Sequence, residues 1–147
     1  MKTVRVVLLL IWVVLSLTAT DLVAQQTATP KRVVVLYWYD KNYPGHVRWD
    51  QGFRPVLEQD ADGSIEYYPE YLEANRFPGE NQAQTLHDYL KDKYAGRPID
   101  VVVAQSDVSL DFLARYHEDL FPNVPVVFYS ATRPKPETLA LWQDITG

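Results

Sequence analysis

Four short apolar runs alternate with amphipathic segments along most of the chain. The run 33–39 is apolar or aromatic at every position and rich in β-branched residues. Because no polar residue alternates with the apolar ones, we expect a strand buried on both faces, as strands of parallel sheets are. Further strands are predicted at 64–72, 99–104 and 124–130. Pro69 places the strand 64–72 near a sheet edge, since proline cannot donate to a central ladder.

Segments with helical periodicity separate these runs. In segment 46–59 one helical face collects four apolar side chains, those of Trp49, Phe53, Val56 and Leu57. Pro55 removes one backbone donor there, so we expect a kink or a restart of this helix. The clearest helix is predicted at 81–96, where Gly96 is a stop signal, and a third is predicted at 108–121.

The predicted elements follow the order β-α-β-α-β-α-β with short links. This alternation predicts an α/β fold, a three-layer Rossmann-like lobe whose parallel sheet is covered by helices. We expect right-handed connections between the strands. After the last strand, a loop with Pro134 and Pro136 leads to a short helix predicted from Leu139 to Trp142.

The N-terminal segment differs in kind from the rest. Lys2 and Arg5 precede an apolar run at 6–17. A basic start followed by about 7–15 apolar residues is typical of a secretory signal, whereas a membrane span needs roughly 20 apolar residues. Residues 1–24 are therefore expected to be a signal peptide or an N-terminal membrane anchor.

The boundaries after this segment leave alternatives open. Leu22 stands three positions before Ala24, where a small residue suits cleavage better, so an uncleaved anchor stays possible, as does a buried helix. Residues 25–32 are polar and contain a proline, which indicates a linker. Residues 33–147 are then the folded domain.

Length and composition bound the function. A chain of 147 residues makes about one domain, and a hydrophobic content of 47% is that of a globular protein. Because the net charge is −5 and no basic block occurs, nucleic acid is not an expected partner. The absence of cysteine excludes thiolate catalysis and cysteine-ligated metals. His46, His87 and His117 lack partners at metal-binding spacing, and no phosphate- or dinucleotide-binding motif occurs, so neither a metal nor a cofactor is expected.

Three loops that follow predicted strands are candidates for ligand binding. In an open parallel sheet, ligands lie beyond the carboxyl ends of the strands, near the point where the strand order reverses. Helix N-termini there present free N–H groups. The candidate contacts are Tyr39 and Asp40 after the first strand, Ser106 and Asp107 after the third, and Ser130 and Thr132 after the fourth.

Each candidate has a structural alternative. Ser106 or Asp107 could serve only as the N-cap of the third helix, a role worth about 1 kcal/mol. Asp40 could simply end a strand. Trp38, Tyr39 and Tyr43 could stack on a planar ligand or belong to the core. Ser106 with Asp107 would suit an exported hydrolase only if His46 approached in space, and no GxSxG motif supports this. We therefore assign no catalytic residue and expect no enzyme.

Several short motifs occur in a fixed order in the runs EYLEANRF (70–77) and LHDYLKDKYAGRPIDVVVAQSDVSLDFLARYHEDLFPNVPVVF (86–128). They are RF after the second strand, KY before the third, LDFL in the third helix, LFP-x-VPVVF, and the closing ITG. At these spacings the chain resembles, over residues 32–147, the extracytoplasmic sensor domains related to ABC transporter substrate-binding proteins.

The resemblance implies a type I periplasmic-binding-protein fold, in which two α/β lobes hold a small molecule between them. It assigns the ligand contacts to the six candidate residues above. Such domains are often fused to sensor histidine kinases or diguanylate cyclases. The chain departs from the pattern after VVF, where relatives often have a Gly-x-Asn-Asp stretch and this chain has YSATRP, at 129–134. The departure lies in the loop that carries Ser130 and Thr132.

The expected function is that of an extracytoplasmic ligand-binding sensory domain, the input module of a two-component sensor histidine kinase or a related signalling protein. The alternative is a periplasmic substrate-binding protein of an ABC transporter. Because TG lies near the crossover into the second lobe in this family, the chain is expected to be the first lobe of a longer protein. The expected partners are a small molecule, the second lobe, and a transmembrane signalling module or an ABC permease. The expected location is periplasmic or otherwise extracytoplasmic, with an inner-membrane anchor as the open alternative.

Overall fold

The computed structural model describes residues 29–59 and 64–140. In this part of the chain, four strands form an all-parallel sheet: β1 (Lys31–Tyr37), β2 (Ile65–Tyr71), β3 (Val101–Gln105) and β4 (Val126–Tyr129). The helices between and after them are α2 (Pro44–Gln59), α3 (Glu80–Tyr94), α4 (Asp107–Leu120) and the short α5 (Pro136–Ala140). The chain is thus an α/β protein with the three-layer, Rossmann-like architecture that its alternating pattern predicts.

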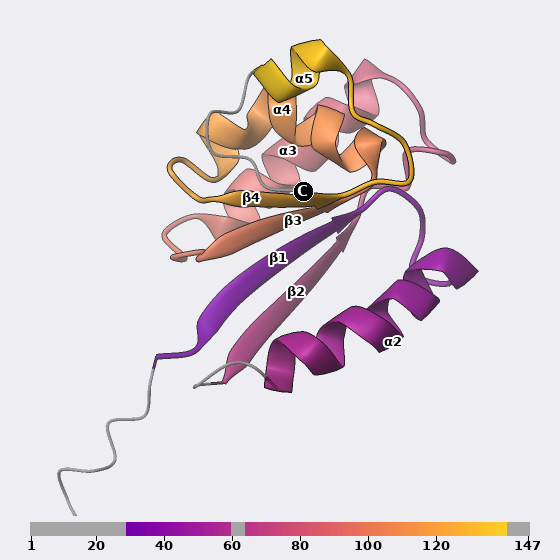
Figure 1. The fold of residues 1–147 in the computed structure, drawn as a ribbon. Helices are drawn as coiled ribbons and strands as arrows, with labels where there is room; N and C mark the ends of the chain where they lie inside the picture. The colour runs from indigo at the N-terminus through magenta and orange to yellow at the C-terminus, as the bar shows by residue number, and fades with distance from the viewer. Residues whose placement is uncertain (1–28, 60–63, 141–147) are drawn as a thin grey trace, which may run out of the picture.

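The strands lie in the order β2-β1-β3-β4, with helices on both faces of the sheet. Helix α2 covers one face, and α3 and α4 cover the other (Figure 1). From β1 the chain moves outward to β2, whereas from β3 it moves outward in the opposite direction to β4. The strand order therefore reverses between β1 and β3, and we call this place the switch point.

Strand β1 is buried on both faces, as its unbroken apolar sequence predicts. Val34 and Leu36 belong to the core under α3 and α4, and Val33 and Val35 belong to the core under α2. All four side chains are at most 3% exposed. Each contributes about 1.5–3 kcal/mol through removal of its apolar surface from water. These two cores hold β1 at the centre of the lobe.

Helix α2 is continuous from Pro44 to Gln59, so the predicted restart at Pro55 does not occur (Figure 1). Pro55 lies on the exposed side of the helix, where water can bind the carbonyl group that lost its partner. Trp49, Phe53 and Leu57 pack on the sheet, as predicted. The prediction was wrong for Val56, which lies at the rim of this apolar stripe and is 57% exposed.

Most other predicted elements occur with boundaries shifted by a few residues. Strand β2 is an edge strand, which explains why it tolerates Pro69. Gly96 follows α3 with a φ of +69°, a value that glycine adopts without strain. Helix α5 begins three residues before the predicted short helix, and its Thr138 hydroxyl donates a hydrogen bond to Asp111 of α4 at 2.8 Å. Trp142, predicted to end that helix, lies outside the described residues.

The predicted signal peptide or anchor (1–24) and the first half of the linker, residues 25–28, also lie outside the described residues, whereas Lys31 and Arg32, predicted to end the linker, belong to strand β1. Among the described helices, none has both the length and the apolar character that a bilayer crossing requires.

Candidate functional site

The six predicted site residues lie along one edge of the sheet. All four strands are parallel, so their carboxyl ends point to the same side, which we call the carboxyl edge. The loops after β1, β3 and β4 supply two residues each: Tyr39 and Asp40, Ser106 and Asp107, and Ser130 and Thr132. Because β1 and β3 are neighbours, the first two pairs flank the switch point, and the third pair lies one strand further out.

Asp40 is a buried carboxylate, 7% exposed, with two partners. Its Oδ1 accepts a hydrogen bond from the backbone N–H of Asn42 at 2.9 Å. Its Oδ2 lies 3.3 Å from a guanidinium nitrogen of Arg76, in the loop between β2 and α3. Asp40 therefore does more than end a strand, since it shapes the loop before α2 and joins it to a second loop.

Aromatic rings cluster beside Asp40. The ring of Tyr39 lies 4.9 Å from that of Trp38 and 4.6 Å from that of Tyr43, measured between centroids. The ring of His46 lies 5.1 Å from that of Tyr43. Tyr39, Trp38 and Tyr43 are all half-buried, so the rings pack on one another and still keep part of their surface exposed. Such surfaces can hold an apolar or planar part of a ligand.

Ser106 is the N-cap of α4, which is one of the two roles that the sequence leaves open for it. Its hydroxyl oxygen accepts a hydrogen bond from the backbone N–H of Ser109 at 3.3 Å. Its backbone has φ 123° and ψ 167°, a region occupied almost only by glycine. Non-glycine residues in such conformations cost about 1–3 kcal/mol and cluster at functional sites. Ser106 thus combines a cap with backbone strain at the switch point.

Asp107 is exposed, and its Oδ1 accepts a hydrogen bond from the backbone N–H of Val108 at 3.1 Å. Together with the cap from Ser106, this bond occupies two N–H groups in the first turn of α4. The negative charge of Asp107 also offsets the positive end of the helix dipole. The N-terminus of α4 is therefore a weaker anion site than the sequence suggests.

The loop after β4 is largely exposed. Ser130 Oγ accepts a hydrogen bond from the backbone N–H of Thr132 at 3.3 Å, and Thr132 is exposed. Both hydroxyls are accessible for further hydrogen bonds. Arg133 is exposed as well. No hydrogen bond or ion pair in the described residues joins this loop to the loops after β1 and β3.

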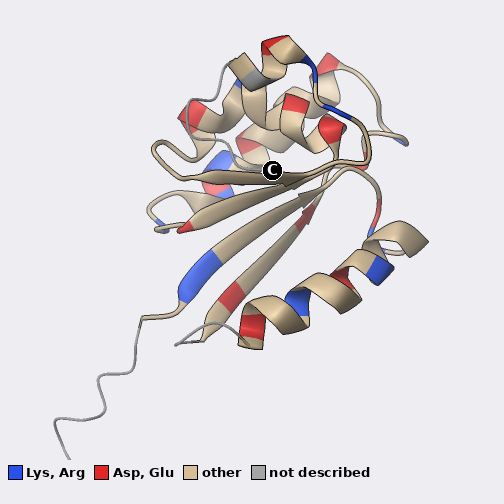
Figure 2. Ribbon diagram, in the orientation of Figure 1, with Lys and Arg blue, Asp and Glu red and all other residues tan. Residues whose placement is uncertain are grey.

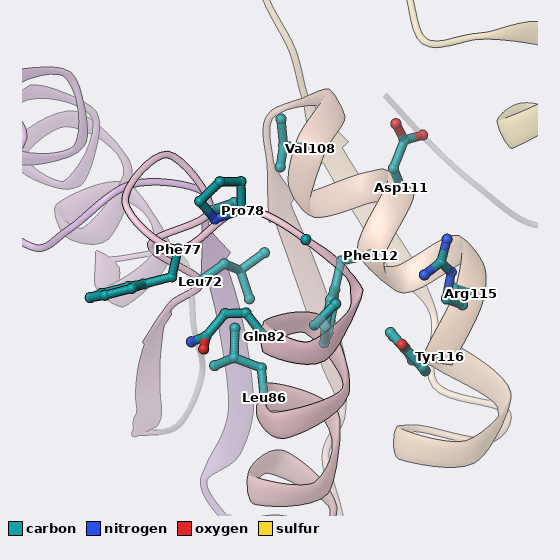
Figure 3. Close-up of a pocket in the computed structure, with 13 residues that line it drawn as sticks. Leu72, Phe77, Pro78, Gln82, Leu86, Val108, Asp111, Phe112, Arg115 and Tyr116 are labelled. Carbon is teal, nitrogen blue, oxygen red and sulfur yellow. The ribbon is translucent and has the colours of Figure 1, made fainter.

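A cavity of about 260 Å³ lies beside the carboxyl edge, between α3, α4 and the loop after β2. The apolar side chains of Leu72, Leu86 and Phe112 and the polar side chains of Gln82 and Arg115 are among those that line it (Figure 3). None of the six predicted site residues lines it. The cavity and the predicted contacts are therefore separate features of the same end of the lobe.

The six predicted contacts leave out three further residues of the carboxyl edge. Arg76 belongs to the RF motif, but nothing in the sequence shows that it pairs with Asp40. Gln105 ends β3 as a polar residue in an apolar run, a signal that could have been followed, and it is 8% exposed. His46 lies at the start of α2 and is 2% exposed. Both lie at the switch point because β1 and β3 are adjacent.

No hydrogen bond joins Ser106 to His46 in the described residues, since the serine oxygen caps α4 and His46 Nδ1 contacts the carbonyl oxygen of Asp40 at 3.3 Å. Among the described residues, no group of three His, Asp or Glu side chains could hold a metal ion. Basic and acidic residues are interspersed over helices and loops, without a single-sign surface in this view (Figure 2).

Comparison with models of known protein families gives no match. No curated protein matches the chain either.

Proposed function

We propose that this chain is an extracytoplasmic small-molecule-binding lobe, the input module of a sensor histidine kinase or a related signalling protein. One observation carries the binding function. Loops from separate parts of the sequence bring two pairs of candidate contacts to the two sides of the switch point, where open α/β sheets bind ligands. The buried Asp40 and the strained Ser106 support it, because neither feature is needed for a plain strand end or an ordinary helix cap.

The sensory and extracytoplasmic parts of the proposal rest on the sequence. The basic and apolar N-terminus supports export, and the ordered motifs from RF to ITG support a sensor-type binding domain. In this proposal a second lobe closes over the carboxyl edge by a hinge motion when ligand binds. A transport receptor that delivers its ligand to an ABC permease is the second candidate, since it would use the same carboxyl edge.

A ligand screen tests the proposal. The complete extracytoplasmic protein, with whatever follows Gly147 in the gene, is heated with a library of small metabolites. A true ligand at 100 times its dissociation constant stabilises the folded state by about 2.7 kcal/mol, which appears as a higher melting temperature. The reading frame downstream separates the two candidates: a membrane helix and a signalling domain support the sensor, and a soluble end beside permease genes supports the transport receptor. A library without any stabilising compound would contradict the binding function.

A further inference from the structure

Two polar side chains are buried at the switch point, and each has an atom without a hydrogen-bond partner. His46 lies in the first turn of α2, and Gln105 is the last residue of β3. Within residues 29–59 and 64–140, no group forms a hydrogen bond with the imidazole Nε2 of His46 or with the amide Oε1 of Gln105. A polar group that is buried without a hydrogen-bond partner destabilises the folded state. Two such groups on neighbouring elements point to a partner that comes from outside the lobe.

The contacts of His46 fix the position of its proton. Nδ1 lies 3.3 Å from the carbonyl oxygen of Asp40. Because a carbonyl oxygen can only accept, this contact requires the proton on Nδ1. Burial lowers the pKa of His46, so the ring is neutral at neutral pH. The free Nε2 is then a hydrogen-bond acceptor.

The side chain of Gln105 points to the same face of the sheet as that of Tyr37, its partner in the register of β1 and β3, and the ring of Tyr37 lies 4.7 Å from that of His46. If the amide oxygen faces Nε2, two acceptors face each other and need a donor between them. If the NH₂ group faces Nε2, it donates a hydrogen bond to that nitrogen, and the amide oxygen of Gln105 then has no donor. In both orientations one acceptor remains unfilled.

The charged groups near the ring are already paired. Asp40 and Asp50 are the carboxylates whose charge acts on His46. Asp40 is paired with Arg76, and Asp50 accepts hydrogen bonds from the hydroxyls of Tyr37 and Tyr67. A cation at this place would also meet the positive ends of the α2 and α4 dipoles. An anion has no hydrogen to donate to the acceptor that lacks a partner.

We propose that His46 and Gln105 form a subsite at the switch point that accepts a hydrogen bond from an uncharged hydroxyl or amide group of a small ligand. The inference rests on the proposed ligand-binding function and specifies the class of its ligand. The ring of Trp38, 6.2 Å from that of His46 and half-buried, offers an adjoining surface for the carbon skeleton of such a ligand.

Three two-carbon probes test the subsite in the isotope-labelled chain: ethanol, acetate and ethylammonium at equal ionic strength. The side-chain nitrogen signals of His46 and Gln105 are followed by NMR during each titration. We expect a saturable shift with ethanol, and no saturable shift with the two ions. The variant Gln105→Leu should weaken the ethanol response at His46 at least tenfold. The matched control Gln51→Leu, on the exposed side of α2, should leave it unchanged.

Other outcomes overturn the inference. A preference for acetate or for ethylammonium would contradict the uncharged donor, and no saturable shift with any probe would show that the pair is sealed. If Gln105→Leu does not fold, Gln105→Met serves as the second variant. A ligand from the metabolite screen that binds the Gln105 variant within twofold of the wild type would overturn the subsite and leave the binding function standing. A metabolite screen that finds no ligand contradicts the proposed binding function, whereas the probe titrations test the subsite.

Discussion

The guanidinium group of Arg76 lies 3.3 Å from the buried carboxylate of Asp40, and this ion pair joins the loop after β2 to the loop after β1. A backbone hydrogen bond from Ala74 to Trp38, at 3.0 Å, connects the same two loops. Arg76 is 55% exposed, whereas the Asp40 side chain is 9% exposed. The pair therefore acts mainly by neutralising a carboxylate that the fold keeps away from water.

Arg76→Ala should destabilise the lobe by about 1 kcal/mol, because an exposed pair contributes little by itself but its loss leaves Asp40 less well paired. The amide of Ala74 should exchange its hydrogen faster, since the two loops lose one connection. Chemical denaturation and hydrogen exchange measure both effects. Arg54→Ala is the matched control, because Arg54 pairs with Glu58 on the exposed face of α2. Equal behaviour of the two variants would contradict a special role for the Arg76 pair.

Ser106 should respond differently to glycine and to alanine. Alanine removes the cap and keeps the strained backbone, so Ser106→Ala should lose about 1 kcal/mol of stability. Glycine relieves the backbone strain and costs only a few tenths as a cap, so Ser106→Gly should match or exceed the wild type. Thermal unfolding of the two variants decides this. A glycine variant less stable than the alanine variant would contradict the strain at this position.

Asp107→Ala should weaken ligand binding more than it lowers the melting temperature. The carboxylate is exposed and, in the part of the chain that the structure describes, bonds only to the neighbouring backbone N–H of Val108, so its contribution to stability is small. Isothermal titration with a ligand from the screen measures the affinity, and thermal unfolding measures the stability. A stability loss of about the usual capping energy with unchanged affinity would show that Asp107 only caps the helix.

Asp50 should hold α2 on the sheet through two tyrosines. Its Oδ1 accepts hydrogen bonds from the hydroxyls of Tyr37 and Tyr67, and Tyr37 is fully buried. Asp50→Ala leaves both hydroxyls without this acceptor and should cost about 2–3 kcal/mol, whereas Asp50→Asn keeps an acceptor oxygen and should cost less. Denaturant unfolding ranks the variants. Equal losses would show that the hydrogen bonds are unimportant.

The stability of the lobe should fall at both ends of the pH range for identifiable reasons. Burial and the bond to Asp50 raise the pKa of Tyr37 and of Tyr67, so the contribution of these two tyrosines to the stability of the folded state is full below about pH 10 and is lost at more alkaline pH.

Burial lowers the pKa of His46, so the stability of the folded state should decline as the pH falls below about 6.5, because the unfolded chain takes up a proton at higher pH than the folded chain does. His46→Phe should flatten the decline between pH 6.5 and 5. An unchanged slope would contradict the neutral state of His46.

The sequence predicted the fold because its apolar runs and helical stripes repeat in a simple order. Three local signals were enough. The apolar run of β1 predicts a strand buried on both faces, Gly96 predicts a helix end, and Pro69 predicts an edge strand for β2. The sequence also predicted that the loops after β1, β3 and β4 lie at one edge of the sheet, since the carboxyl ends of parallel strands share one edge. The Asp40–Arg76 pair and the His46–Gln105 pair depend on which strands are neighbours, and the order β2-β1-β3-β4 is not visible in the periodicity. The backbone strain at Ser106 is likewise a property of three-dimensional packing.

The binding of a small molecule at the carboxyl edge is the central claim, and amide chemical-shift mapping tests it most directly. The isotope-labelled chain is titrated with pools of small metabolites, and the shifted backbone signals are placed on the structure. The account predicts shifts that cluster in the loops after β1 and β3, around Asp40 and Ser106. Shifts confined to the cavity between α3 and α4, around Phe77 and Phe112, would contradict it and move the binding site to that cavity.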